Sequence, residues 1–111
     1  MSTDTDRIAS FKAMLARGQD SEMLRYTLGG ACLDAEQYAD AIEHLTQAVT
    51  LKPDYTAAWK LLGRAHAAAG DPSAAVIAFD HGLLAGEANG DKQGVKEIEV
   101  FRKRALKAIP D

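Results

Sequence analysis

The chain has 111 residues and a formal net charge of −3, and 47% of its residues are hydrophobic although only 6% are aromatic. A chain of this length forms one domain and leaves little room for a large catalytic cleft. The acidic balance argues against nucleic acid as the partner, because nucleic-acid binders carry a basic surface. No apolar run approaches the ~20 residues that cross a bilayer, so we also expect no membrane insertion.

The N-terminal region and the cysteine usage predict a cytoplasmic protein. Residues 1–7 are polar and include Asp4 and Asp6, unlike a secretory signal. Cys32 is the one cysteine of the sequence and cannot form a disulfide within the chain. The apolar residues are mainly Ala and Leu, which favours closely packed helices.

The first predicted helix covers residues 4–17. Ile8, Phe11 and Leu15 follow one another at helical spacing, and Gly18 is placed to end the helix. The spacing predicts a short amphipathic helix at the N-terminus.

Residues 20–53 read as a hairpin of two helices. Asp20 or Ser21 caps the first helix, and the chain turns near residues 36–37. The second helix runs over 38–51 and stops before Pro53, which has no N–H to continue it. The residues that we expect to point inward are Leu24, Leu28, Ala31, Cys32, Ala35, Ala41, Ile42, Leu45, Ala48 and Val49.

Residues 54–88 read as a second hairpin with the same organisation. We expect Asp54 to cap its first helix, 70–72 to form the turn, and the second helix to run from Pro72 to about Gly86 before a reversal at 89–90. The expected inward residues are Ala58, Trp59, Leu62, Ala65, His66, Ala69, Ala75, Val76, Phe79, Gly82 and Leu83.

A last helix is predicted over 91–109, capped by Asp91 and carrying Ile98 and Phe101 on its apolar face. Lys96 and Glu97 stand where a third copy of the hairpin would have Leu and Gly, so this helix is a cap. The segment is locally basic, and we interpret its charges as a solvated face.

The two hairpins are copies with a period of 34 residues. Leu28–Gly29 recurs as Leu62–Gly63, and each glycine is followed twelve residues later by an alanine, Ala41 or Ala75. Small residues let two helices approach closely where they cross. The repeat therefore predicts an all-α fold, an α-solenoid of antiparallel helical hairpins with a capping helix at each end.

Trp59 opens the pattern in the second copy, where the first copy has Arg25. A single aromatic residue at a repeat position is typical of packing, so we expect Trp59 to be covered by the preceding pair of helices.

The residues Trp59, Leu62, Gly63, Ala75 and Phe79, with their copies 34 positions upstream, resemble the tetratricopeptide repeat. The resemblance covers about residues 20–88. It departs from the family pattern at Arg25, Cys32, His66, Gly82 and Glu87. It implies a protein–protein interaction module in which the first helix of each repeat faces a concave groove. Because the sequence has no Gly-rich phosphate loop, nucleophile elbow or paired carboxylates, we also expect no enzymatic activity and no cofactor.

The resemblance places a peptide-binding site on the outward positions of those first helices. In the first repeat these are Met23, Tyr26, Gly30, Leu33 and Asp34, and in the second they are Ala57, Lys60, Arg64, Ala67 and Ala68. Within that set, Lys60 and Arg64 lie at i and i+4, so both cations project from one face. They either hold a carboxylate of the partner or are a solvated pair that contributes little. The family's asparagines for a carboxylate are absent at the matching places.

Other functions have less support in the sequence. The edge of a short stack can pair with a second copy, which makes self-association as a weak homo-oligomer the alternative to a foreign ligand. Cys32 and His66 occupy equivalent positions, but two buried side chains explain them better than a metal site does. A catalytic role would require a reactive thiol at Cys32.

Overall fold

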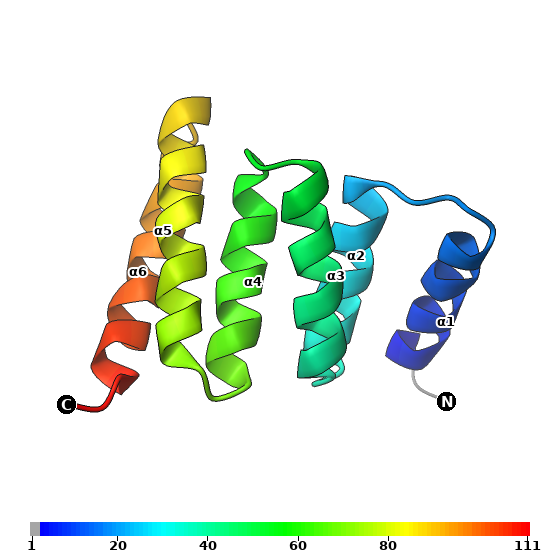
Figure 1. Ribbon diagram of the computed structural model, residues 1–111, viewed down its shortest axis with the longest axis horizontal. Coiled ribbons are helices and arrows are strands. Elements are labelled where there is room, and N and C mark those ends of the chain that lie inside the picture. Colours follow the sequence, from blue (N-terminus) through cyan, green and yellow to red (C-terminus); the bar gives the residue numbers. More distant parts are fainter. Residues whose placement is uncertain (1–2) are drawn as a thin grey trace.

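The computed structural model describes residues 3–111, which form six helices and no strand (Figure 1). The helices are α1 (Thr3–Ala16), α2 (Glu22–Asp34), α3 (Tyr38–Leu51), α4 (Thr56–Ala68), α5 (Pro72–Asn89) and α6 (Lys92–Ala108). They run alternately up and down, with α1 and α6 at opposite ends of the longest dimension of 42 Å. The predicted all-α solenoid of antiparallel hairpins is confirmed.

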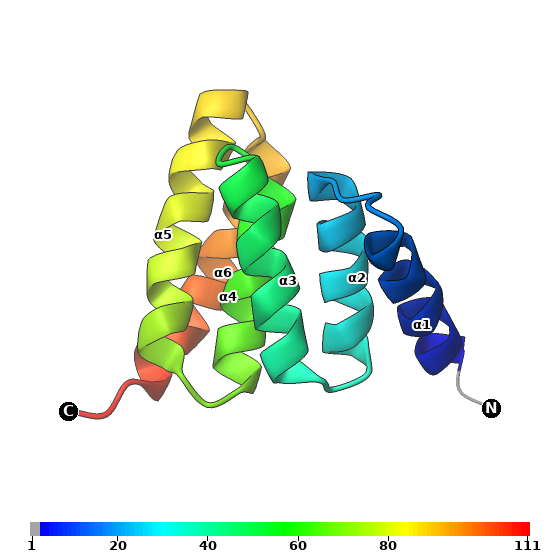
Figure 2. The same ribbon diagram turned by 45° about the vertical axis from the view of Figure 1, so that its right-hand side comes forward.

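The helices form two layers. Each helix contacts the next one in the chain, and in addition α2 contacts α4 and α4 contacts α6, whereas α3 makes no contact with α5 within the described residues. Figure 1 shows α2 partly behind α3 and α6 partly behind α5, and in Figure 2 α4 and α6 lie behind α3 and α5. Because neighbours touch only in the layer of α2, α4 and α6, the stack curves toward that layer, which is its concave side.

Side-chain caps begin two of the helices as the sequence predicts. Ser21 Oγ accepts a hydrogen bond from the N–H of Leu24 at 3.0 Å, which decides between Asp20 and Ser21 as the cap of α2. Asp91 Oδ1 accepts from the N–H of Gly94 at 2.9 Å and caps α6. Each cap fixes the entry of a helix that belongs to the concave layer.

The predicted cap of α4 is wrong. Tyr55 stands at the N-cap without a side-chain hydrogen bond, and Asp54 lies one residue earlier in the turn. The backbone carbonyl of Asp54 accepts hydrogen bonds from the N–H of Thr56 and from the side-chain amide of Asn89 at 2.8 Å. Asp54 therefore connects the start of α4 to the end of α5 through its backbone.

Helix α5 continues to Asn89, three residues beyond the predicted end at Gly86. Gly86 is buried, and a Cβ there would come within 2.8 Å of Val95 on α6 and 3.3 Å of Thr56 on α4. This glycine permits close packing in mid-helix, and the left-handed residue that ends α5 is Gly90, with φ of 68°.

Where the two helices of each hairpin cross, a large side chain of one helix packs against a glycine of the other. A Cβ added at Gly63 would overlap the ring of Phe79, and one added at Gly29 would overlap the side chain of Leu45. Leu45 and Phe79 are 0% and 1% exposed. The alanines at the predicted crossing positions are also fully buried. Small residues in register therefore allow the two helices of each hairpin to nest.

Trp59 packs as predicted only in part. Its side chain is half-buried, and its Nε1 donates a hydrogen bond to the carbonyl of Pro53 at 2.7 Å. Its ring stacks on His81 of α5 with 4.6 Å between ring centroids. The ring that covers Trp59 by stacking therefore belongs to the second hairpin, and not to the preceding pair of helices as predicted. Ala69, another residue of the predicted stripe, is the exposed C-cap of α4.

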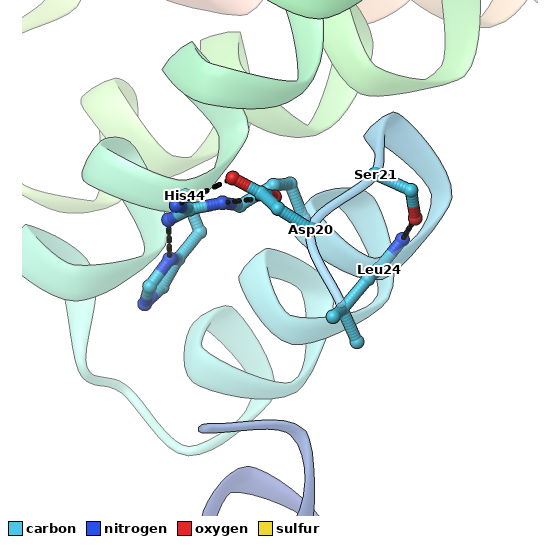
Figure 3. A network of polar contacts seen from close by, with 5 residues as sticks. Asp20, Ser21, Leu24 and His44 are labelled. Carbon is cyan, nitrogen blue, oxygen red and sulfur yellow. Dashed lines mark hydrogen bonds and ion pairs between the residues drawn. The ribbon is translucent and has the colours of Figure 1, made fainter. Parts of the chain in front are cut away.

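A polar network stands in the first hairpin at Arg25, the position that Trp59 takes in the second. Arg25 donates two hydrogen bonds to Asp20, at 2.9 and 3.1 Å, and its Nη1 lies 3.0 Å from Nδ1 of His44 (Figure 3). His44 is only 7% exposed. Burial and the neighbouring Arg25 charge lower the pKa of His44, which favours the neutral ring with Nδ1 as acceptor.

Because the Phe79 ring packs directly on Gly63, a methyl group added at Gly63 should destabilise the fold. Gly63→Ala should lower the free energy of unfolding by roughly 1 to 3 kcal/mol, because the buried ring of Phe79 has nowhere to move. Urea denaturation monitored by circular dichroism measures the change.

Gly30→Ala is the matched control, since a Cβ there meets only Leu61 Cδ1 at 3.5 Å, an ordinary contact. It should leave stability unchanged or raise it by about 0.5 to 1 kcal/mol through helix propensity. Equal effects of the two substitutions would contradict the nested crossing.

The network at His44 predicts a dependence of stability on pH. Because the pKa of folded His44 lies below its ordinary value of 6.5, the unfolded chain takes up a proton first. The free energy of unfolding should therefore decrease as the pH falls below about 6.5. His44→Asn keeps an acceptor near the place of Nδ1 and removes the titration, so its stability should vary less between pH 7.5 and 5.5. Parallel losses in both proteins would assign the effect to other groups.

Candidate protein-binding groove

The concave layer carries a hollow of about 280 Å³ between α1, α2 and α4. Tyr26, Gly30, Leu33 and Asp34 of α2 line it, and so do residues that the sequence did not suggest, Arg7 of α1 and Leu61 of α4. Tyr26, Leu33 and Leu61 are half-buried and pack against the core, so each has one side against the protein and one toward the hollow. Most of the first-repeat residues predicted for the site therefore lie together.

An aromatic pair fixes Tyr26. Its ring lies 5.0 Å from that of Tyr55, with an interplanar angle of 31°. Burial, and secondarily the neighbouring Tyr26, raises the pKa of Tyr55, so the hydroxyl stays protonated at neutral pH. The pair presents an ordered amphipathic surface beside the hollow.

A second hollow, of about 410 Å³, lies between α4 and α6 and contains both predicted cations. Lys60 and Arg64 line it from α4, with Glu97, Phe101 and Arg104 opposite on α6. Helix α6 therefore forms half of the concave surface in this part of the stack. The sequence suggested a solvated face for the charges of α6, and the apolar spacing alone could not show that Glu97 and Arg104 turn toward α4.

The two predicted cations have different surroundings. Lys60 Nζ donates a hydrogen bond to Glu97 Oε1 at 3.1 Å, and Gln93 donates to the other carboxylate oxygen. Hydrogen bonds from Lys60 and Gln93 lower the pKa of Glu97. The guanidinium carbon of Arg64 lies 5.0 Å from the centre of the Phe101 ring, and among residues 3–111 Arg64 forms no ion pair. Lys60 thus has an internal carboxylate partner, while Arg64 keeps its charge available.

The remaining predicted residues are more scattered. Met23 is 69% exposed, and Ala68 is exposed at the end of α4. Ala57 lines a small hollow with Lys60 and Gly94, and Ala67 lines a pocket at the opposite end of α4. Four of the ten predicted positions therefore line the hollow near α1 and two line the hollow near α6, while the other four lie outside both hollows.

Cys32 is fully buried, and burial raises the pKa of its thiol. A neutral, inaccessible thiol is a poor nucleophile and metal ligand. Within the described part of the chain, no three His, Cys, Asp or Glu side chains are grouped so that they could hold a metal ion. None of the described helices is both long and apolar enough to cross a bilayer.

Comparison with known proteins places this fold in a family. The profile of the tetratricopeptide repeat matches residues 32–91. A TPR repeat-containing protein of Pseudomonas aeruginosa is 44% identical over 91% of this chain and 96% of its own length. The Hsp70-Hsp90 organizing protein of Triticum aestivum is 29% identical over 90% of this chain, which corresponds to 17% of that protein.

A solved structure agrees with these sequence relatives. The solution structure of a Bordetella parapertussis protein is 40% identical, covers 90% of this chain and 87% of its own, and superposes with a TM-score of 0.78. The family profile matches more than half of the chain, and the alignment with the Pseudomonas protein covers nearly the full length of both proteins. The chain belongs to the tetratricopeptide repeat family.

Proposed function

We propose that this protein binds a segment of a partner protein along its concave layer, with Met23, Tyr26, Leu33, Lys60, Arg64 and Ala67 in the contact surface. Tetratricopeptide repeats generally mediate protein–protein interactions. The similarity to a protein named for organizing Hsp70 and Hsp90 supports a protein as the partner. The observation that carries the proposal is the curved layer whose hollow holds half-buried Tyr26, Leu33 and Leu61.

The two halves of the groove have different roles in this mechanism. Tyr26, Leu33 and Leu61 supply apolar contact, which contributes most of the affinity. Arg64 supplies a charge that fixes the register of an acidic group on the partner. Lys60 participates by exchanging Glu97 for the carboxylate of the partner, so it contributes less than Arg64.

The proposed partner is a protein, not a nucleic acid or a membrane. The net charge of −3 opposes binding to phosphate backbones. The proposal needs no cofactor and no catalytic step, and it keeps the cytoplasm as the expected compartment.

Leu33→Asp should abolish or strongly reduce recovery of the partner. The substitution replaces an apolar contact surface of the hollow with a charge, which a docked side chain of the partner would separate from water. Affinity purification from cells of the source organism with tagged wild type and variant, quantified by mass spectrometry, identifies the partners that depend on the groove.

Leu51→Asp is the matched control, because Leu51 is 52% exposed on α3 in the opposite layer. It should retain every groove-dependent partner, and circular dichroism should show both variants folded. Equal recovery by Leu33→Asp and wild type would place the binding surface elsewhere. Loss with Leu51→Asp alone would move it to the outer layer.

Self-association is the second candidate function, favoured by two exposed apolar residues on α5. Ile77 and Leu84, at i and i+7, are 62% and 68% exposed on the same helix. If a second copy covers them, light scattering should show a mass that rises with concentration and returns to the monomer value in Ile77→Asp. A monomer mass at every concentration would eliminate this candidate.

A further inference from the structure

A pocket of about 430 Å³ opens where α4, α5 and α6 meet, at the C-terminal ends of α4 and α6. Its lining is apolar apart from two side chains: Ala67 and Phe79 contribute to it from α4 and α5, and Phe101 and Ala105 from α6. The two exceptions are Arg64 and Arg104. No acidic residue is among the described residues that line it.

Both arginines are held on the ring of Phe101. The guanidinium carbon of Arg64 lies 5.0 Å from the ring centre, and that of Arg104 lies 5.6 Å from it. Within residues 3–111 neither arginine forms an ion pair. The basic residues that do are Arg7, Arg25, Lys60 and Arg102. Two like charges beside one ring repel each other, and an anion between them would relieve that repulsion.

The contact with Phe101 orders the guanidinium groups and leaves donors free. A cation–π contact engages the guanidinium without using its N–H groups as hydrogen-bond donors. Those N–H groups form a planar fork that matches a carboxylate and binds it through two parallel hydrogen bonds. The two arginines are therefore ordered donors without an acceptor in the described structure.

We propose that this pocket binds an acidic side chain that adjoins an apolar side chain in a partner peptide. The carboxylate lies between Arg64 and Arg104, and the apolar side chain enters the pocket against Phe79 and Ala105. The occupant is a peptide because Arg64, Phe101 and Arg104 also line the hollow of the groove, so the pocket continues the surface along which a chain would run. The inference rests on the proposed function and adds α6 and a sequence preference to it.

The test uses the whole protein and capped tetrapeptides that have no free terminal carboxylate. Acetyl-Gly-Glu-Leu-Gly-amide is titrated into the ¹⁵N-labelled protein and compared with the versions that contain Gln for Glu or Ser for Leu. Amide shifts should appear at residues 64, 67, 101, 104 and 105, and both altered peptides should bind about tenfold more weakly, as expected for loss of a charge-assisted hydrogen bond or a buried apolar group.

Arg104→Gln is the decisive variant because Arg104 is not among the contact residues named for the proposed function and its side chain is exposed. It should weaken binding of the Glu-Leu peptide about tenfold, whereas Lys103→Gln, which removes the same charge from the preceding residue of α6, should not. Equal binding of the Glu and Gln peptides, equal effects of the two variants, or no shifts around Phe101 would each overturn the inference.

The outcome separates this inference from the proposed function. If partners recovered through the groove are lost with Leu33→Asp and kept with Arg104→Gln, the groove is the binding site and the acidic pocket is not part of it. If Leu33→Asp keeps every partner and the Glu-Leu peptide still binds at Phe101, the groove proposal fails and the pocket stands alone.

Discussion

The contact of a large side chain with the backbone of a glycine is the constraint on which this fold depends. Phe79 lies over Gly63 and Leu45 lies over Gly29, so the two helices of each hairpin approach more closely than a Cβ would permit. Close approach buries Ala41 and Ala75 completely and lets the next hairpin stack on the first. The spacing inside each hairpin, and hence the curvature that makes one layer concave, follows from which residues are small.

Helix α6 gives the second half of the concave surface its charge pattern. Glu97 neutralises Lys60, whereas Phe101 engages Arg64 without neutralising it. Neither the ion pair of Glu97 with Lys60 nor the contact of Phe101 with Arg64 is needed to shield the core from water. The hollow near α1 and α2 offers the apolar surfaces of Tyr26, Leu33 and Leu61, whereas the hollow near α6 carries Arg64, Arg104 and Phe101. A partner segment with apolar residues at one end and an acid at the other matches both regions.

The repeat architecture was predictable from the sequence, because glycine, alanine and leucine recur at fixed offsets and the packing requires those sizes. The caps of α2 and α6 were predictable because a short side chain with a hydrogen-bond acceptor is strongly preferred just before a helix. For α2 the sequence left Asp20 and Ser21 as alternatives. Asp54 looked equivalent, but it is the copy of Asp20, which does not cap α2 either. Tyr55 stands 34 residues after the cap Ser21, and its side chain makes no capping hydrogen bond. The predicted end of the helix near Gly86 was too early, because the sequence alone does not show that Gly86 is packed against Val95 in the middle of a helix.

The candidate site was predictable only on α2 and α4. Periodicity within a helix identifies which positions share a face, and it placed Tyr26 beside Leu33 and Lys60 beside Arg64. It carries no information on which distant side chain lies opposite, so Arg7, Glu97 and Arg104 were missed. His44 was missed as a core residue for a related reason: its partner Arg25 lies on another helix and replaces the aromatic residue of the second repeat.

Proton NMR of the Gly63 α-protons tests the central contact most directly. If the ring of Phe79 lies on the backbone of Gly63, these protons should show nuclear Overhauser effects to the ring protons of Phe79 and a resonance displaced by its ring current, which Phe79→Leu removes. Gly63 α-protons at ordinary shifts without any such effect would contradict the nesting of the hairpin and, with it, the curved layer that forms the groove.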